Sequence, residues 1–329
     1  MKKALQYLIS LTIAGGLLWF VFKDVDINAL FETFSEADYR WVALSGALAL
    51  IAHWSRAYRW KLMLQPIGYN PSAYKTMLAV LIGYAVNLVL PRAGELARCG
   101  SLQKLEGVPF EKSFGAVVAE RLVDVLILLL LIGLNLLLEF DRISGFFFEL
   151  IGDKFDNTAL LGGIAIVGVL LILLCILLFR KYKSKIEQLA FYQKVSSIVS
   201  GLWSGFTSIK NLKNPAPFIG HTVLIWIMYY CMTYALCFAL PETASLSPLA
   251  GLTILVMGTI GMAAPTIGGI GSYHFLVGKI VALYGINAQI GITLATFLHS
   301  MMGVLFVLLF GFIAFILTFV VKKTDSSTS

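Results

Sequence analysis

The chain has 329 residues, of which 59% are hydrophobic and only 13% are charged. This composition is far more apolar than that of soluble globular domains, and it excludes a pair of soluble domains of ordinary size. Apolar runs of about 20 residues recur, which predicts a single all-α, polytopic membrane domain over residues 1–323. The net charge of +7 does not indicate nucleic-acid binding, because the basic residues gather in particular loops, as in the positive-inside bias of membrane proteins.

The N-terminal segment begins with Lys2 and Lys3 and continues as a long apolar run without a small-residue cleavage site. We expect an uncleaved anchor over residues 4–22, with the N-terminus in the cytoplasm. A second span is predicted over residues 41–64, and Arg56 and Arg59 lie on one face near its end. These arginines are expected either to snorkel to the inner interface or to meet lipid phosphates there.

The stretch from Asn87 to Arg98 interrupts the next apolar run at Pro91 and Gly94. A helix over this stretch would place three charged residues on one face, since they are spaced three apart: Arg92, Glu95 and Arg98. Charged side chains and non-helical backbone within the hydrocarbon region are tolerated only where other protein segments or a water-filled cavity surround them. We therefore predict a re-entrant pair of helices over residues 75–104, entering from the cytoplasmic side, with the polar centre of a membrane pathway at its break.

A span over residues 114–138 carries Glu120, Arg121 and Asp124 just before or within its apolar run. These groups either lie among the lipid headgroups or face the same cavity as Arg92 and Glu95. The second interpretation is favoured, because the apolar run begins only at Leu122 and pairing with arginine lowers the cost of burying a carboxylate.

Three more spans and a surface helix are expected further along. The spans cover residues 159–179, 216–240 and 288–321, and a cluster of lysines and arginines follows the first of them. Residues 184–212 show helical spacing of apolar side chains, which predicts an amphipathic helix on the cytoplasmic surface. The C-terminus is expected in the cytoplasm, with a disordered tail over residues 324–329.

A second break, from Pro265 to Gly271, repeats the Pro-x-x-Gly pattern of the first. We expect a re-entrant pair over residues 248–285 that enters from the outer side, which would complete a pseudo-inverted repeat; chance Pro and Gly kinks are the alternative. Three glycines would let backbone approach a ligand closely: Gly268, Gly269 and Gly271. His274 beside them is either a proton-linked group or a hydrogen-bonding member of the bundle.

The four cysteines form no CxxC pair, and the sequence holds no metal-ligand cluster, nucleotide-binding loop or nucleophile–base pair. No metal and no cofactor is therefore expected. If the chain were an enzyme, the carboxylates Glu95, Glu120 and Asp124 would be the candidates for acid–base work.

The first break, the Glu120-Arg121-x-x-Asp124 segment and the later glycine-rich break occur in an order that resembles one family. This is the flippase-like family named after the transmembrane region of lysylphosphatidylglycerol synthase, which includes the N-terminal membrane domain of the multiple peptide resistance factor. The resemblance implies movement of aminoacylated or glycosylated lipids between leaflets. Many members carry a glutamate where this chain has Ser272, Tyr273 and His274, and no aminoacyltransferase domain follows in this chain.

We therefore expect a lipid flippase of the bacterial inner membrane, not an enzyme, that passes the headgroup through a charged cavity between the two re-entrant pairs. The expected partner is a membrane phospholipid or glycolipid, not nucleic acid; a separately encoded lipid-modifying enzyme and a second copy of the chain are further candidates. The alternatives are a transporter of a small soluble anion, an integral-membrane lipid-linked transferase and a scaffold for a partner enzyme.

Overall fold

The computed structural model describes residues 34–90, 92–143, 200, 203–204, 207–212, 214–264 and 266–320. No strand occurs within these ranges, so the all-α prediction is confirmed. The helices are α3 (Tyr39–Leu64), α4 (Ala73–Val89), α5 (Gly94–Glu106), α6 (Phe110–Leu138), α10 (Pro215–Cys237), α11 (Pro248–Ala263), α12 (Ser272–Leu283), α13 (Ala288–Leu298), a π-helical turn (His299–Leu305) and α14 (Phe306–Val320). Short 3₁₀ turns cover Gln65–Ile67, Ser208–Asn211, Pro241–Thr243 and Ile267–Gly269. The predicted spans over residues 4–22 and 159–179, most of the amphipathic helix and the tail lie outside the described residues.

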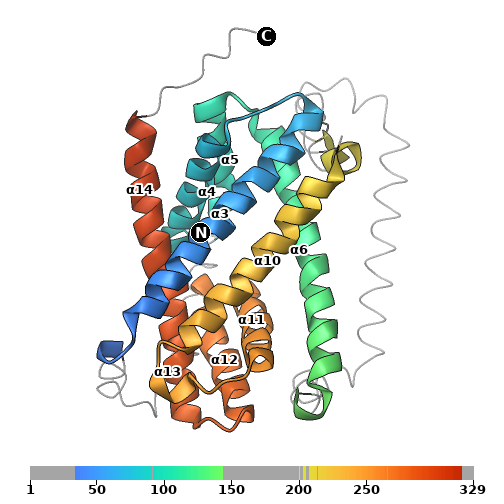
Figure 1. Cartoon of the computed structure of the whole chain (residues 1–329). Coiled ribbons are helices and arrows are strands. Elements are labelled where there is room, and N and C mark those ends of the chain that lie inside the picture. Colours follow the sequence, from blue (N-terminus) through green and yellow to red (C-terminus); the bar gives the residue numbers. More distant parts are fainter. Residues whose placement is uncertain are drawn as a thin grey trace, which may run out of the picture.

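The helices form an elongated bundle in which α3 and α10 lie side by side along its length (Figure 1). Helices α4 and α5 occupy the upper half of this view, whereas α11, α12 and α13 occupy the lower half. Buried apolar residues form two clusters that follow this division. One gathers mainly around α11, α12 and α13, and the other lies between α5, the end of α3 and the start of α6.

The first predicted pair of half-helices is confirmed as a helical hairpin of α4 and α5. At 17 residues, α4 is about 25 Å long, which is shorter than a hydrocarbon core of about 30 Å. The two helices can touch because Gly83 and Gly94 face each other: a Cβ on Gly94 would collide with the Gly83 carbonyl oxygen. The Asn87 Oδ1 atom accepts a hydrogen bond of 2.7 Å from the Gly94 amide, which fixes the return of the chain.

The second predicted pair forms a hairpin of α11 and α12. Its tip is also closed by a tightly packed glycine and by a polar side chain that bonds to the backbone. Gly261 lies against the Tyr273 backbone, so that a Cβ there would overlap it. The Ser272 hydroxyl donates to the Gly261 carbonyl over 2.7 Å and lies 3.1 Å from that of Gly269. Each hairpin is thus closed by a small residue and a polar side chain at its break, and the hairpins lie in opposite halves of the molecule (Figure 1).

Three stretches of described helix are long and apolar enough to cross a membrane: Phe110–Leu138, Pro215–Cys237 and Ala288–Thr318. The last joins α13 to α14 through the π-helical turn, so a single continuous helix long enough for the predicted final span is present. The outer face of α6 is lined by exposed leucines over most of its length, as expected for a helix in contact with lipid. The total of six spans stays a prediction.

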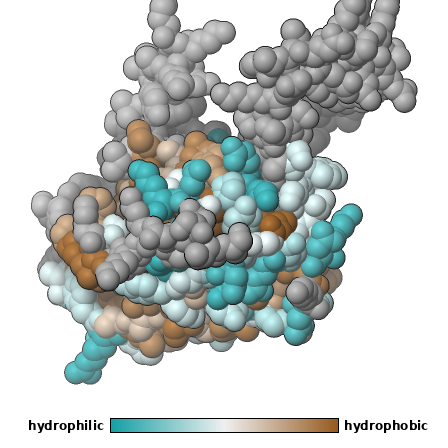
Figure 2. Space-filling view, turned by 90° about the horizontal axis from the view of Figure 1, so that it is seen from above, coloured by the Kyte–Doolittle hydropathy of each residue, from teal (hydrophilic) through white to brown (hydrophobic). Residues whose placement is uncertain are grey.

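Seen from above, the end of the bundle where α3 and α5 end and α6 begins carries several hydrophilic side chains (Figure 2). Gln65, Gln103 and Lys104 are exposed in this region. A further group of charged side chains lies deeper, between α3, α5 and α6.

Candidate functional site: a buried arginine–carboxylate cluster

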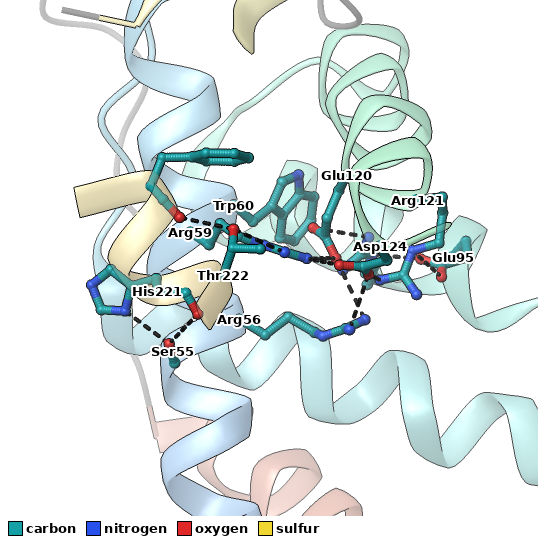
Figure 3. A network of polar contacts seen from close by, with 12 residues as sticks. Ser55, Arg56, Arg59, Trp60, Glu95, Glu120, Arg121, Asp124, His221 and Thr222 are labelled. Carbon is teal, nitrogen blue, oxygen red and sulfur yellow. Dashed lines mark hydrogen bonds and ion pairs between the residues drawn. The ribbon is translucent and has the colours of Figure 1, made fainter. Parts of the chain in front are cut away.

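Charged side chains from α3, α5 and α6 converge inside the bundle (Figure 3). Helix α3 contributes two arginines, α5 a carboxylate and an arginine, and α6 two carboxylates and an arginine. We call this set the arginine cluster: Arg56, Arg59, Glu95, Arg98, Glu120, Arg121 and Asp124. Spacings of three or four residues bring Arg56 near Arg59, Glu95 near Arg98, and Asp124 near both Glu120 and Arg121 on the surfaces of their helices.

Glu120 is the centre of the arginine cluster. Its side chain is 0% exposed, and its oxygens lie 3.4 Å from Arg56 Nη1, 3.3 Å from Arg59 Nη2 and 3.4 Å from Arg98 Nη2. Arg121 supplies the fourth guanidinium. A carboxylate surrounded in this way stays charged at tolerable cost, because each neighbour offers positive charge and N–H donors.

Asp124 lies one turn further along α6 and shares three of these arginines. Its Oδ1 atom accepts a 2.8 Å hydrogen bond from Arg59, and its Oδ2 atom one of 3.2 Å from Arg56. Arg121 lies 3.4 Å away on the same helix. Arg56 and Arg59 are therefore each held by both α6 carboxylates, which ties the end of α3 to α6.

Glu95 and Arg121 form the open edge of the arginine cluster. The Glu95 carboxylate lies 2.7 Å from Arg98 Nε and 3.5 Å from Arg121 Nε. Their side chains are 32% and 39% exposed, whereas those of Arg98 and Glu120 are almost completely buried. A group arriving from outside would meet this edge first.

Aromatic rings surround the buried arginines and lower the local dielectric. The Arg98 guanidinium lies 4.7 Å from the ring centre of Trp60, which is itself fully buried. Arg59 faces Phe218 at 5.9 Å and Arg56 faces Tyr229 at 5.8 Å. Such cation–π contacts stabilise a guanidinium that has lost its water.

The arginine cluster carries an unbalanced positive charge, because four guanidinium groups face three carboxylates. Within the part of the chain that the structure describes, the Nε atoms of Arg56 and Arg59 are buried without a hydrogen-bond partner. Buried donors of this kind are costly unless something accepts from them. The arrangement therefore suits an additional anionic group.

A recess beside the arginine cluster is lined by Arg56, Tyr84, Asn87, Glu95, Arg98 and three small or apolar residues of the hairpin. Its volume of about 10 Å³ matches roughly one water molecule. Among the described residues, this recess is therefore too small to hold a lipid headgroup. Asn87 both lines the recess and holds the hairpin turn through Gly94.

Arg92 does not take the place predicted for it. Helix α5 begins only at Gly94, and Arg92 precedes it with a left-handed backbone (φ 66°), exposed to the surroundings. The expected helical face with Arg92, Glu95 and Arg98 is therefore wrong for Arg92, whereas Glu95 and Arg98 do pair. Because α5 starts only at Gly94, the spacing of three residues between Arg92 and Glu95 is not a helical spacing and does not place the two side chains on one face.

Arg56 and Arg59 are also placed differently from the expectation. They do not reach an interface as snorkelling side chains would: they are 5% and 0% exposed and point into the bundle. The prediction that Glu120, Arg121 and Asp124 face the same site as Arg92 and Glu95 is confirmed for Glu95, to which they are linked by ion pairs, but not for Arg92. Sequence reasoning missed Trp60 and Thr222, whose hydroxyl lies 3.3 Å from Arg59, since nothing in their local pattern distinguishes them from core residues.

The glycine-rich break lies apart from the arginine cluster, whose polar contacts join α3, α5, α6 and α10. Gly268 is exposed, and Gly269 and Gly271 are buried; all three have positive φ. His274 is buried beside them and its ring lies 5.0 Å from that of His299, a residue that sequence reasoning did not single out. Among the described residues, no group of three or more His, Cys, Asp or Glu could hold a metal ion.

Comparison with known proteins finds a family that this chain matches. The family model described as "Lysylphosphatidylglycerol synthase TM region" matches residues 7–311. A UPF0104 membrane protein of Methanocaldococcus jannaschii is 29% identical over 131 residues, which are 39% of this chain and 38% of that protein. The glycosyltransferase AglD of Haloferax volcanii is 27% identical over 132 residues, 38% of this chain and 21% of AglD.

The matched segments thus span well under half the length of these relatives. The comparison with solved structures finds no match. The family model, in contrast, covers most of the chain, and both hairpins and the arginine cluster lie within the matched residues. The chain belongs to the family of the lysylphosphatidylglycerol synthase transmembrane region.

Proposed function

We propose that this multi-pass membrane protein is a lipid flippase that moves the headgroup of a phospholipid, or of a modified lipid, between leaflets past the arginine cluster. The observation that carries the proposal is a buried cluster with one excess positive charge whose Arg121–Glu95 edge is partly exposed. Membership of the lysylphosphatidylglycerol synthase transmembrane-region family supports a lipid as the substrate.

The position of Arg121 on α6 suits a lipid better than a soluble ion. Exposed apolar side chains follow it at once along the same helix: Leu122, Val125, Leu126, Leu129 and Leu130. A phosphate on Arg121 would therefore leave the acyl chains against these leucines, within the hydrocarbon region. Guanidinium groups bind phosphate through paired N–H donors, which makes arginine the appropriate residue at this edge.

Transport requires the arginine cluster to open, because the recess beside it holds only about one water molecule. In the closed state, the arginines form ion pairs with Glu95, Glu120 and Asp124. A phosphate entering at Arg121 would take over some of these contacts and so replace the ion pairs between α5 and α6. Glu95, once released from Arg121, would be free to contact a cationic part of the headgroup.

The proposed location is the inner membrane of a bacterium, with both termini in the cytoplasm. The positive-inside bias of the sequence supports this orientation. A separately encoded enzyme that modifies the lipid, and a second copy of this chain, are proposed partners.

A second candidate is an integral-membrane transferase that acts on lipid-linked sugars, because one relative is named a glycosyltransferase. All three carboxylates of the arginine cluster are held in ion pairs, and Glu95 is the most exposed of them. Glu95 would then be the group available for acid–base work. Turnover of a labelled lipid-linked donor by the purified protein would favour this candidate.

The proposal is tested with purified protein in vesicles that contain fluorescent phospholipids, quenched from outside. We expect wild-type protein to expose inner-leaflet lipid that stays protected in protein-free vesicles, with anionic headgroups moving faster than zwitterionic ones. Inorganic phosphate is the competitor that separates a lipid from a soluble anion. Strong inhibition by millimolar phosphate, together with phosphate uptake and no lipid movement, would contradict the flippase and favour a transporter of soluble anions.

A further inference from the structure

The second break contains a pair of facing histidines. His274 lies in the first turn of α12, and His299 begins the π-helical turn between α13 and α14. Their ring centres are 5.0 Å apart, and the Tyr273 ring lies 5.3 Å from that of His299. Broken helices and π-helical turns are both places where membrane transporters and enzymes locate ion or substrate sites.

Both imidazoles lie beside the irregular backbone of the hairpin tip. The Gly271 amide donates a hydrogen bond of 3.3 Å to His274 Nδ1, and the His299 ring lies close to the backbone of Gly268. Both glycines have positive φ, 84° and 60°, so the tip has a conformation that other residues rarely adopt. Because Nδ1 of His274 accepts this bond, the proton of the neutral ring must be on Nε2.

Among the residues that the structure describes, few other titratable groups lie near this pair. Tyr273 comes from α12 itself and Cys237 from α10, close to Tyr273; neither is charged in its protonated form. Helices α11, α13 and α14 contain no titratable residue within their bounds. A proton on one imidazole would therefore disfavour a second on the other, since like charges at this separation repel strongly in a medium of low dielectric.

We propose that His274 and His299 form a site for a single proton, and that its occupancy is linked to the shape of the second hairpin tip. A proton that binds His274 must take the Nδ1 lone pair, because Nε2 already carries hydrogen. It then competes with the Gly271 amide for that lone pair and releases the cap of α12. Combined with the proposed function, and resting on it in this one respect, the site would couple lipid movement to a proton gradient.

The proton site itself is tested on the purified protein, without transport. The chain has four histidines, so imidazole nitrogen NMR with single variants can assign each titration. His274→Gln is the matched substitution, since glutamine at this third helical position keeps an acceptor for the Gly271 amide but cannot titrate. His221→Gln, outside the pair, is the control.

We expect one ring of the pair to bind a single proton, and we expect the midpoint of the remaining ring to change in His274→Gln and in His299→Gln. His221→Gln should change neither. If neither ring takes a proton at any pH at which the bundle stays folded, or if each titrates independently of the other, the proposed site is refuted. A melting curve of each variant shows whether the bundle is intact.

The link to transport is measured in the fluorescent-lipid vesicles with and without a pH gradient. Wild type should move lipid faster with a gradient, and both histidine variants should lose that difference while keeping exchange at equal pH. Lipid exchange in wild type that ignores the gradient would refute the coupling and leave the flippase intact. An absence of exchange under every gradient would refute the flippase, and the NMR titration would then decide the proton site alone.

Discussion

At the scale of single residues, Glu120 shows how a charged group is stabilised inside an apolar bundle. It contacts four guanidinium groups from three helices and is inaccessible from outside. Ion pairs in the interior are weak evidence for stability, because the cost of removing water can equal the gain from attraction. Removing one member is a different matter, since the remaining charges then stay buried without compensation.

Glu120→Gln should therefore destabilise the protein by about 3–5 kcal/mol, because four arginines would face only two carboxylates. Glu111→Gln, on the same helix and without an ion pair among the described residues, should change stability by less than about 1 kcal/mol. Reversible denaturation in detergent measures both. Equal stabilities of the two variants would show that Glu120 does not hold the arginine cluster together.

Arg98→Lys keeps the charge but should not keep the function of the side chain. The Arg98 guanidinium bonds Glu95 and Glu120 while it stacks on Trp60, a geometry that needs a planar group with several donors. We expect a loss of about 1–3 kcal/mol in the free energy of unfolding, from the lost stacking and one lost ion pair. A lysine variant with wild-type stability would mean that only charge matters at this position.

At the scale of elements, each hairpin depends on glycines where its two helices meet. Gly94 is the clearest case, because a Cβ added there would meet the Gly83 carbonyl oxygen and the Asn87 side chain. The backbone atoms there cannot move aside as the end of a flexible side chain can. The close packing of Gly94 on Gly83 therefore determines the shape of both the hairpin tip and the recess beside the arginine cluster.

Gly94→Ala should therefore push α4 and α5 apart at the break and cost about 1–3 kcal/mol of stability. Gly100→Ala is the matched control on the same helix, since a Cβ there meets nothing within 4 Å. It should be neutral or stabilising by up to about 1 kcal/mol, because alanine favours helix. Thermal unfolding of both variants in the same detergent gives the comparison, and a harmless Gly94→Ala would contradict the close packing.

The elements themselves were largely predictable from sequence, and the reason lies in their local signals. Apolar runs ended by Pro and Gly predicted both hairpins, and the spacing of Glu120 and Asp124 predicted a shared face. The partners of Arg56 and Arg59 could not be predicted, since they lie more than 60 positions along the chain on α6. Arg92 was misplaced because a spacing rule for helices was applied across a break where the backbone becomes left-handed.

At the scale of the whole molecule, α6 connects the two halves through polar contacts at separate levels. Its first part joins the arginine cluster, and further along Asn135 donates a 2.8 Å hydrogen bond to the Thr253 hydroxyl on α11. Most of the helix surface between these points is exposed and apolar. Because Asn135 is bonded to Thr253, a movement of α6 that opens the arginine cluster would also displace α11, which is part of the second hairpin.

The measurement that tests the central claim most directly is the rate of lipid translocation in vesicles that contain Arg121→Gln. Arg121 is partly exposed, so its loss should remove the first phosphate contact without unfolding the bundle. Arg40→Gln, the same change at an exposed position far along α3 from the cluster, is the control. We predict at least a tenfold slower translocation for Arg121→Gln, equivalent to about 1.4 kcal/mol of lost interaction, and a wild-type rate for Arg40→Gln. Equal rates for Arg121→Gln, Arg40→Gln and wild type, at equal protein insertion, would contradict the claim that the lipid headgroup passes the arginine cluster.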